Sequence, residues 1–98
     1  MIRKYTPDNV RYKDMHNEEL KENFSVNLFE PGESTFYYTD LDRCVVGSVV
    51  PLDDKIKLET SKELASEYFA QRREIGVINI GDKGTVSVDG TDYELENK

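Results

Sequence analysis

The side chains best suited to binding a small molecule lie in the stretch "QRREIG", where Arg72, Arg73 and Glu74 follow one another. A guanidinium in a cavity suits a carboxylate ligand, because its planar fork donates to both carboxylate oxygens at once. If a strand extends back to residue 72, Arg72 and Glu74 face one side of it and Arg73 faces the other. The spacing therefore predicts Arg72 and Glu74 as substrate-binding residues. The alternative is structural: Arg72 and Glu74 pair with each other, or Arg73 bridges to a neighbouring subunit.

No other set of residues predicts a catalytic group or a metal site. The chain has one histidine, His16, and one cysteine, Cys44, whereas a catalytic zinc needs three protein ligands that converge on it. We expect His16 to cap a helix or lie on the surface, and Cys44 to be a buried, unreactive thiol. The acidic stretches "DLD" and "LDD" do not have the spacing of a calcium loop. The sequence thus predicts no catalytic residue and no metal ligand in this chain.

The composition limits the class of protein. A chain of 98 residues forms one small domain at most, and a formal net charge of −7 argues against a nucleic-acid partner. The apolar run "CVVGSVVP" is too short to cross a membrane. No apolar stretch follows the basic residues of "MIRKYTPDN", so we do not expect this segment to be a signal peptide. With a single cysteine no internal disulfide forms, and we expect a cytoplasmic protein without a membrane partner.

The elements that must position these residues fall into two parts. We expect residues 1–24 to be a polar arm, with a short helix in "HNEELKENF" that Asn17 caps. Residues 25–98 read as mainly β. A second short helix is predicted in "TSKELASEYF" (60–69), where Thr60 and Glu63 fit a capping box.

Strands are expected wherever apolar or β-branched residues alternate or form short runs between turns. The run 43–51 looks buried on both faces. Val86, Val88, Tyr93 and Leu95 should share one face of a hairpin that turns at Asp89–Gly90. Many short strands with regular turns predict a β-sandwich or barrel. The expected strands are "SVNLFE" (25–30), "TFYYTDLD" (35–42), "RCVVGSVVP" (43–51), "KIKLE" (55–59), "EIGVINI" (74–80), "TVSV" (85–88) and "TDYEL" (91–95).

The last third of the chain resembles part of the first motif of the cupin superfamily. Glu74 and Gly81 have the motif's six-residue spacing, and "KGTVSVDGTDYEL" resembles the hairpin that follows its glycine. The motif's histidine positions fall on Tyr68 and Ala70, or on Glu67 and Phe69 in its longer variant. The resemblance implies a partial cupin-like jelly roll over residues 25–98, without the metal-binding half of the motif and incomplete at its C-terminal end.

A closer resemblance is to the 5-keto-4-deoxyuronate isomerase family, also called 4-deoxy-L-threo-5-hexosulose-uronate ketol-isomerases. It rests on the block "YFAQRREIGVINIGDKGTVSVDGTDYEL", with support from "YYTDLDRCVVGSVVP", and extends from about residue 20 to the end. The resemblance implies a homo-oligomeric enzyme of two cupin-like halves. Such an enzyme interconverts 5-keto-4-deoxyuronate and 3-deoxy-D-glycero-2,5-hexodiulosonate in pectin breakdown, an isomerisation of the aldose–ketose type. It also implies zinc, held by His and Glu ligands of the C-terminal half that have no matching positions here.

We therefore expect this chain to be the N-terminal segment of such an isomerase. The segment would supply scaffold and oligomer contacts, bind no zinc and be inactive by itself. Two alternatives remain. The chain is either a metal-free cupin-like module that binds a sugar acid or an assembly partner without catalysis, or a structural domain with no ligand.

Overall fold

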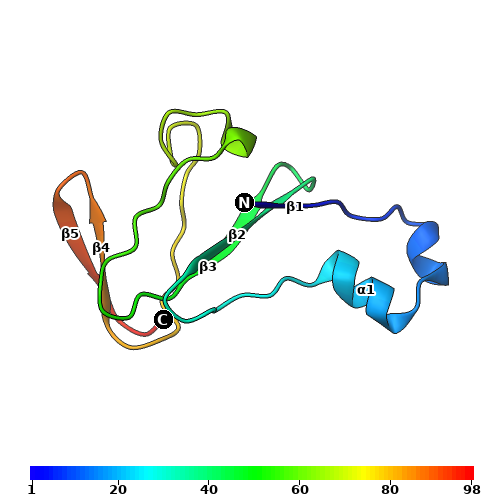
Figure 1. Cartoon of the computed structure of the whole chain (residues 1–98), viewed down its shortest axis with the longest axis horizontal. Coiled ribbons are helices and arrows are strands. Elements are labelled where there is room, and N and C mark those ends of the chain that lie inside the picture. Colours follow the sequence, from blue (N-terminus) through cyan, green and yellow to red (C-terminus); the bar gives the residue numbers. More distant parts are fainter.

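The structure is a computed structural model that describes all residues, 1–98, and it is mainly β, as the sequence predicts (Figure 1). A three-stranded sheet and a separate two-stranded sheet are joined by long connections with little regular structure. The elements in chain order are β1 (Ile2–Lys4), the 3-10 helix η1 (Arg11–Asp14), α1 (Asn17–Phe24), β2 (Ser34–Thr39), β3 (Val45–Val49), the 3-10 helix η2 (Lys62–Leu64), β4 (Gly84–Val88) and β5 (Thr91–Leu95).

The three-stranded sheet has the order β1-β2-β3, with β1 parallel and β3 antiparallel to the central strand. The strands predicted in 35–42 and 43–51 are confirmed with shorter bounds. The start of the chain was predicted to be a polar arm, and this is wrong for β1. Its backbone pairs with β2, so that Arg3 lies beside Tyr38. A tight turn joins β2 to β3, and both its central residues, Asp42 and Arg43, have positive φ.

The second sheet is the predicted hairpin of β4 and β5. Asp89 and Gly90 have φ of 48° and 82°, as a type I′ turn requires. Val86 pairs with Tyr93 and Gly84 pairs with Leu95. Because directly opposite residues share a face and every second residue returns to it, the four predicted side chains do lie on one face.

The first predicted helix is confirmed as α1, with a small correction at its start. His16 rather than Asn17 is the N-cap, since the Leu20 N–H donates to the His16 carbonyl oxygen at 2.9 Å. The His16 side chain makes no capping hydrogen bond.

The second predicted helix, over 60–69, is wrong. Only the short η2 forms, because Ala65 adopts the left-handed conformation (φ 50°, ψ 45°) and ends the helix after one turn. The expected capping box is absent as well. The Thr60 hydroxyl donates instead to the Ser66 carbonyl oxygen at 3.0 Å. The reversal at Ala65 returns the chain so that Phe69 packs on Phe36, with ring centroids 5.1 Å apart.

Three further predicted strands, 25–30, 55–59 and 74–80, do not form. These segments alternate as strands do, but none finds a hydrogen-bonded partner strand in the chain. The prediction that the run 43–51 is buried on both faces is also wrong, since Ser48 is the only buried residue of β3. Cys44 lies just before this strand and is exposed, which contradicts its expected burial.

Both faces of the three-stranded sheet are partly covered by connecting segments. On one face the Phe29 N–H donates to the Ser48 hydroxyl at 2.8 Å. On the other face Phe69 packs against Phe36. The core is nevertheless very small, because only Tyr37, Leu64 and Ser48 are buried.

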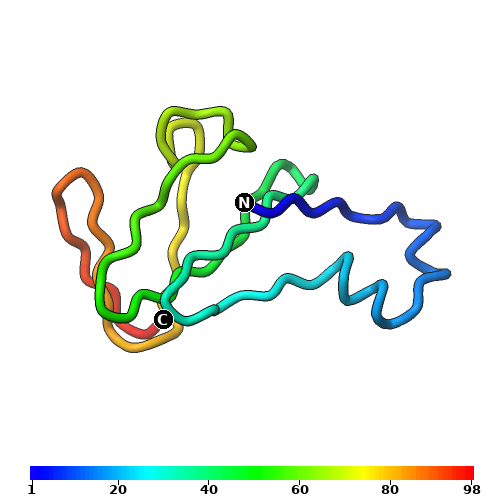
Figure 2. The backbone as a smooth tube through the Cα atoms, in the orientation of Figure 1, coloured from blue at the N-terminus to red at the C-terminus, as the bar shows by residue number.

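The molecule is open and elongated. Figures 1 and 2 show α1 projecting at one end and the β4–β5 hairpin at the other. The accessible surface is 8283 Å², against about 5,700 Å² for a folded monomer of this mass. The radius of gyration is 15.7 Å, against about 13 Å for a compact chain of this length. No helix in the structure has the length and apolar character needed to span a membrane.

Candidate functional site

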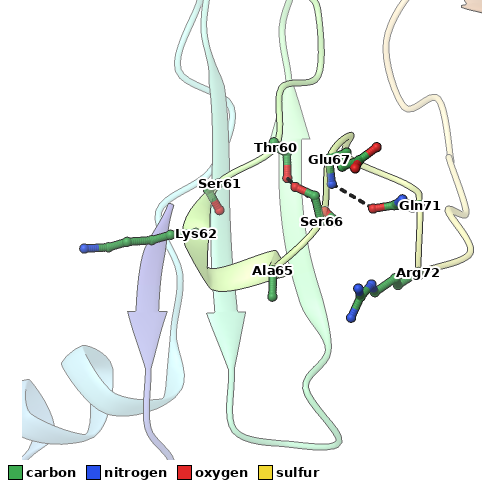
Figure 3. Close-up of a pocket in the computed structure, with 8 residues that line it drawn as sticks. All are labelled: Thr60, Ser61, Lys62, Ala65, Ser66, Glu67, Gln71 and Arg72. Carbon is green, nitrogen blue, oxygen red and sulfur yellow. Dashed lines mark hydrogen bonds between the residues drawn. The ribbon is translucent and has the colours of Figure 1, made fainter.

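Arg72, the first of the two predicted substrate-binding residues, helps to line an open hollow of about 530 Å³ within the loop 60–72 (Figure 3). The loop is held in part by the Glu67 N–H, which donates to the Gln71 side-chain oxygen at 2.7 Å. Lys62 also contributes to the lining, but its side chain extends away from the others. The hollow therefore presents mainly hydroxyl and amide groups around a single nearby guanidinium.

Glu74, the second predicted residue, is not brought together with Arg72. Residues 73–80 form no strand, so the expected common face does not exist. Glu74 is exposed and is not among the lining residues of the hollow. The structural alternative, an Arg72–Glu74 ion pair, is not formed either, because the only ion pairs of the chain lie elsewhere.

Arg73 is instead the arginine that the fold holds in place. Its guanidinium carbon lies 5.2 Å from the centroid of the Tyr38 ring, within the range of a cation–π contact. One of its nitrogens donates to the Arg43 carbonyl oxygen and another lies 3.5 Å from the Tyr38 hydroxyl. These contacts fix the segment after the loop 60–72 against the end of β2 and the turn that follows it.

Arg3 approaches the same ring from the neighbouring strand, with its guanidinium carbon 5.3 Å from the Tyr38 centroid. Beside this cluster lies a second hollow, of about 290 Å³. It is smaller and more enclosed than the first, and contributions from β1, β2 and the turn after β2 form its walls. The residues that line it are Arg3, Lys4, Tyr5, Tyr38, Asp40 and Arg43.

The lining of the second hollow has more positive than negative side chains: Arg3, Lys4 and Arg43 against Asp40. No carboxylate lies within ion-pair distance of Arg3, Arg43 or Arg73. Asp40 is the only acidic side chain of the lining, and its oxygens accept hydrogen bonds from the Thr6 N–H at 3.0 and 3.1 Å and from the Thr6 hydroxyl at 3.0 Å.

A single carboxyl near this region has a shifted pKa. The pKa of Glu63 lies below its ordinary value, first because of a hydrogen bond from its own backbone N–H and then because of the Ser61 hydroxyl. The N-terminal ammonium and Arg3 lower it further. Glu63 is partly exposed and its pKa is lowered rather than raised, so this shift marks a favourable electrostatic position rather than a catalytic acid.

Sequence reasoning missed the residues around Tyr38. Tyr38, Asp40 and Arg43 all lie in "YYTDLDR", a stretch that was noted for its family resemblance but not for its chemistry. No sequence signal could have added Arg3, because only the parallel pairing of β1 with β2 brings it beside Tyr38.

The side chains of the chain do not fit a zinc site. No three His, Cys, Asp or Glu residues come together in an arrangement that could hold a metal ion. His16 lies at the start of α1, and Cys44 lies exposed before β3.

Comparison with known proteins gives one consistent name. A curated protein of Lachnoclostridium phytofermentans, named 4-deoxy-L-threo-5-hexosulose-uronate ketol-isomerase, is 49% identical over 82 residues, or 83% of this chain and 30% of its own length. Proteins of the same name from Bacillus pumilus and Caldicellulosiruptor bescii are 41% and 42% identical over 100% and 90% of the chain. The chain covers 36% and 32% of those two proteins.

The chain thus spans about a third of the length of the curated relatives it matches. No protein-family model matches it. The resemblance stated from the motifs is confirmed by these relatives, and the share covered is consistent with the prediction that the chain is one portion of such a protein.

Proposed function

The chain is homologous to the 4-deoxy-L-threo-5-hexosulose-uronate ketol-isomerases over about a third of their length, and we propose that it is the N-terminal segment of such an enzyme. The enzyme would interconvert 5-keto-4-deoxyuronate and 3-deoxy-D-glycero-2,5-hexodiulosonate, a step in the breakdown of pectin and related polyuronides. The observation that carries this proposal is the 49% identity to a relative of that name across most of the chain.

An isomerisation of this type moves a proton between neighbouring carbons through an enediol. It needs a base near the reacting carbon and an electrophile that stabilises the developing oxyanion. The structure offers neither as a preformed set in this chain, since no acidic side chain is buried and its one histidine lies at the start of α1. We assign the base, the electrophile and the zinc that the family resemblance implies to other parts of the enzyme.

The role proposed for this segment is scaffold and oligomer contact. Its accessible surface exceeds that of a folded monomer by about 2,500 Å², and burying apolar surface is the main source of stability in folding and association. Much of the excess is apolar. Ile75, Val77, Ile78 and Ile80 are 47%, 54%, 79% and 55% exposed in a segment without strand partners. In the full enzyme we expect further strands or a second subunit to cover this segment. We also propose that the enzyme is cytoplasmic.

A segment exchange tests the proposal. In the Lachnoclostridium phytofermentans relative, the residues that match this chain are replaced by residues 1–98, and the rate of 5-keto-4-deoxyuronate isomerisation is measured. We expect the chimera to keep the relative's oligomeric state and a kcat within about tenfold of it, a difference of roughly 1.4 kcal/mol in barrier. A chimera with an unchanged Tm and oligomeric state but no turnover would contradict the proposed role.

The isolated chain provides the complementary test. Purified residues 1–98, washed with chelator and then exposed to zinc, should retain no stoichiometric metal by elemental analysis and show no isomerase turnover. One zinc bound per chain would show that the assignment of the metal to other parts of the enzyme is wrong. Sugar-acid binding by a protein that cannot support turnover in the chimera would favour the metal-free binding module instead.

A further inference from the structure

We propose that Arg3 and Arg43, with Arg73 packed on the Tyr38 ring beside them, form a binding site for the carboxylate of a small sugar acid. The site lies in the hollow of about 290 Å³ between β1, β2 and the turn that follows β2. Arg3 and Arg43 line the hollow directly. Arg73 supports it from behind the lining, through its contact with the Tyr38 ring at 5.2 Å and its hydrogen bond to the Arg43 carbonyl oxygen.

The charge balance indicates an anionic ligand. The chain carries a net charge of −7, with 20 acidic residues for 13 basic ones. Despite this excess of carboxylates, none lies within ion-pair distance of the three arginines. The lining contains one carboxylate, Asp40, which accepts hydrogen bonds from Thr6, against three cationic side chains, Arg3, Lys4 and Arg43. The guanidinium groups of Arg3 and Arg43, which line the hollow, are thus available to an external carboxylate, with which they form charge-assisted hydrogen bonds.

The backbone at Arg43 supports a role for its side chain. Asp42 and Arg43 occupy the central positions of the β2–β3 turn with φ of 51° and 52°. Positive φ at these positions strongly favours glycine at the second one, and the β4–β5 turn of the same chain has that arrangement at Asp89–Gly90. The β2–β3 turn instead carries an arginine in a conformation that a side chain disfavours. The hairpin is therefore less stable with arginine at this position than it would be with glycine.

The rest of the lining favours a sugar acid over a simple inorganic anion. Two aromatic residues, Tyr5 and Tyr38, offer ring faces and hydroxyl groups, and Asp40 retains acceptor capacity for a sugar hydroxyl. Ligand sites combine apolar or aromatic walls with a few placed polar groups in this way. The choice of a sugar acid rests on the proposed function. The anion site itself rests on the arginines.

The test is a titration of the intact chain with D-galacturonate, followed by NMR chemical shifts, with D-galactose and inorganic phosphate as comparison ligands. We expect galacturonate to bind at least about tenfold more tightly than galactose, because only galacturonate offers the charged acceptor. We also expect it to bind more tightly than phosphate, and the shift changes should centre on Tyr38 and Arg43. Galacturonate binding no tighter than galactose, or weaker than phosphate, would overturn the sugar-acid assignment.

Arg43→Gly distinguishes a loss of binding from a loss of folding. Glycine adopts positive φ without strain, so the substitution should raise Tm by a few degrees. The same variant should weaken galacturonate binding by about tenfold, and Arg3→Gln should weaken it similarly. Arg11→Gln is the matched control, because Arg11 is an exposed arginine whose ion pair is with Asp8, at 3.5 Å. The Arg11→Gln chain should bind galacturonate as tightly as the unaltered chain does. A more stable Arg43→Gly chain with unaltered affinity would refute the site. The titration measures binding and no turnover. Its result is therefore independent of whether the chimera keeps isomerase activity.

Discussion

Replacement of Gly47 by alanine tests the packing on which the three-stranded sheet depends. Gly47 pairs with Phe36 across β2 and β3. A Cβ added at Gly47 would lie 2.6 Å from both Phe36 Cε1 and the Thr35 carbonyl oxygen, and closer still to Phe36 Cδ1. Carbon atoms in contact normally lie about 3.5–4.0 Å apart. The Thr35 oxygen belongs to the backbone and cannot move aside, so the Phe36 ring must leave its position.

The magnitude follows from what that movement breaks. Forcing an extra methyl group into space that other atoms occupy costs about 1–3 kcal/mol. Loss of the Phe36–Phe69 ring contact, at 5.1 Å between centroids, adds about 0.5–1.5 kcal/mol. The free energy of unfolding should therefore fall by about 2–4 kcal/mol, which for a chain of this size lowers Tm by roughly 10 °C or more.

Thermal unfolding followed by circular dichroism measures this change. Gly76→Ala is the matched control, because a Cβ at Gly76 meets no atom within 4 Å, and its Tm should stay close to that of the unaltered chain. In a Phe36→Ala background the part of the penalty that comes from the ring should disappear, and the part that comes from the Thr35 carbonyl oxygen should remain. If Gly47→Ala unfolds within about 2 °C of the parent chain, Phe36 does not pack over Gly47 and the register of β2 on β3 must be revised.

Three further substitutions test other parts of the fold. Gly90→Ala should destabilise the β4–β5 hairpin by about 1–2 kcal/mol, since Gly90 has φ of 82°, and faster amide exchange confined to the hairpin would show it. Leu64→Ala should lower the free energy of unfolding by about 2–3 kcal/mol in a denaturant titration, because Leu64 is 5% exposed, whereas Leu52→Ala, at 68% exposure, should have little effect. The lowered pKa of Glu63 means that its carboxylate stabilises the fold above the ordinary value of 4.5, and that this contribution is lost as pH falls through the lowered pKa. Glu63→Gln should therefore flatten the dependence of Tm on pH below 4.5, and an unchanged acid dependence would show that the carboxylate makes no such contribution.

Elements that depend on nearby residues were predicted well from the sequence. The β4–β5 hairpin has its turn at Asp89–Gly90 and its four apolar side chains on one face, because a two-residue turn fixes the register of the strands beside it. Helix α1 was also predicted, with an error of one residue at its cap. In both cases the hydrogen-bond partners are a few residues apart in the chain, so a local pattern contains the necessary information.

Predictions that required a distant partner failed. The segment 74–80 has the apolar pattern of a strand but no partner strand, so the expected common face of Arg72 and Glu74 does not exist. The helix predicted over 60–69 gave way to a reversal at Ala65, which lets Phe69 reach Phe36. Cys44 was expected to be buried because its neighbours are apolar, but burial depends on what covers the strand edge.

The sequence by itself determined the resemblance to the ketol-isomerases and the mainly β character of the chain, since these depend on residue types and their order. The tertiary structure alone decided where the positive charge gathers. Of the "RRE" stretch, the residue with tertiary contacts to the sheet is Arg73, because its segment crosses beside Tyr38. Arg3, about seventy residues away in sequence, joins it through the pairing of β1 with β2. Spacing along a chain cannot predict such a meeting, because strand pairing between distant segments is settled by the packing of the whole sheet.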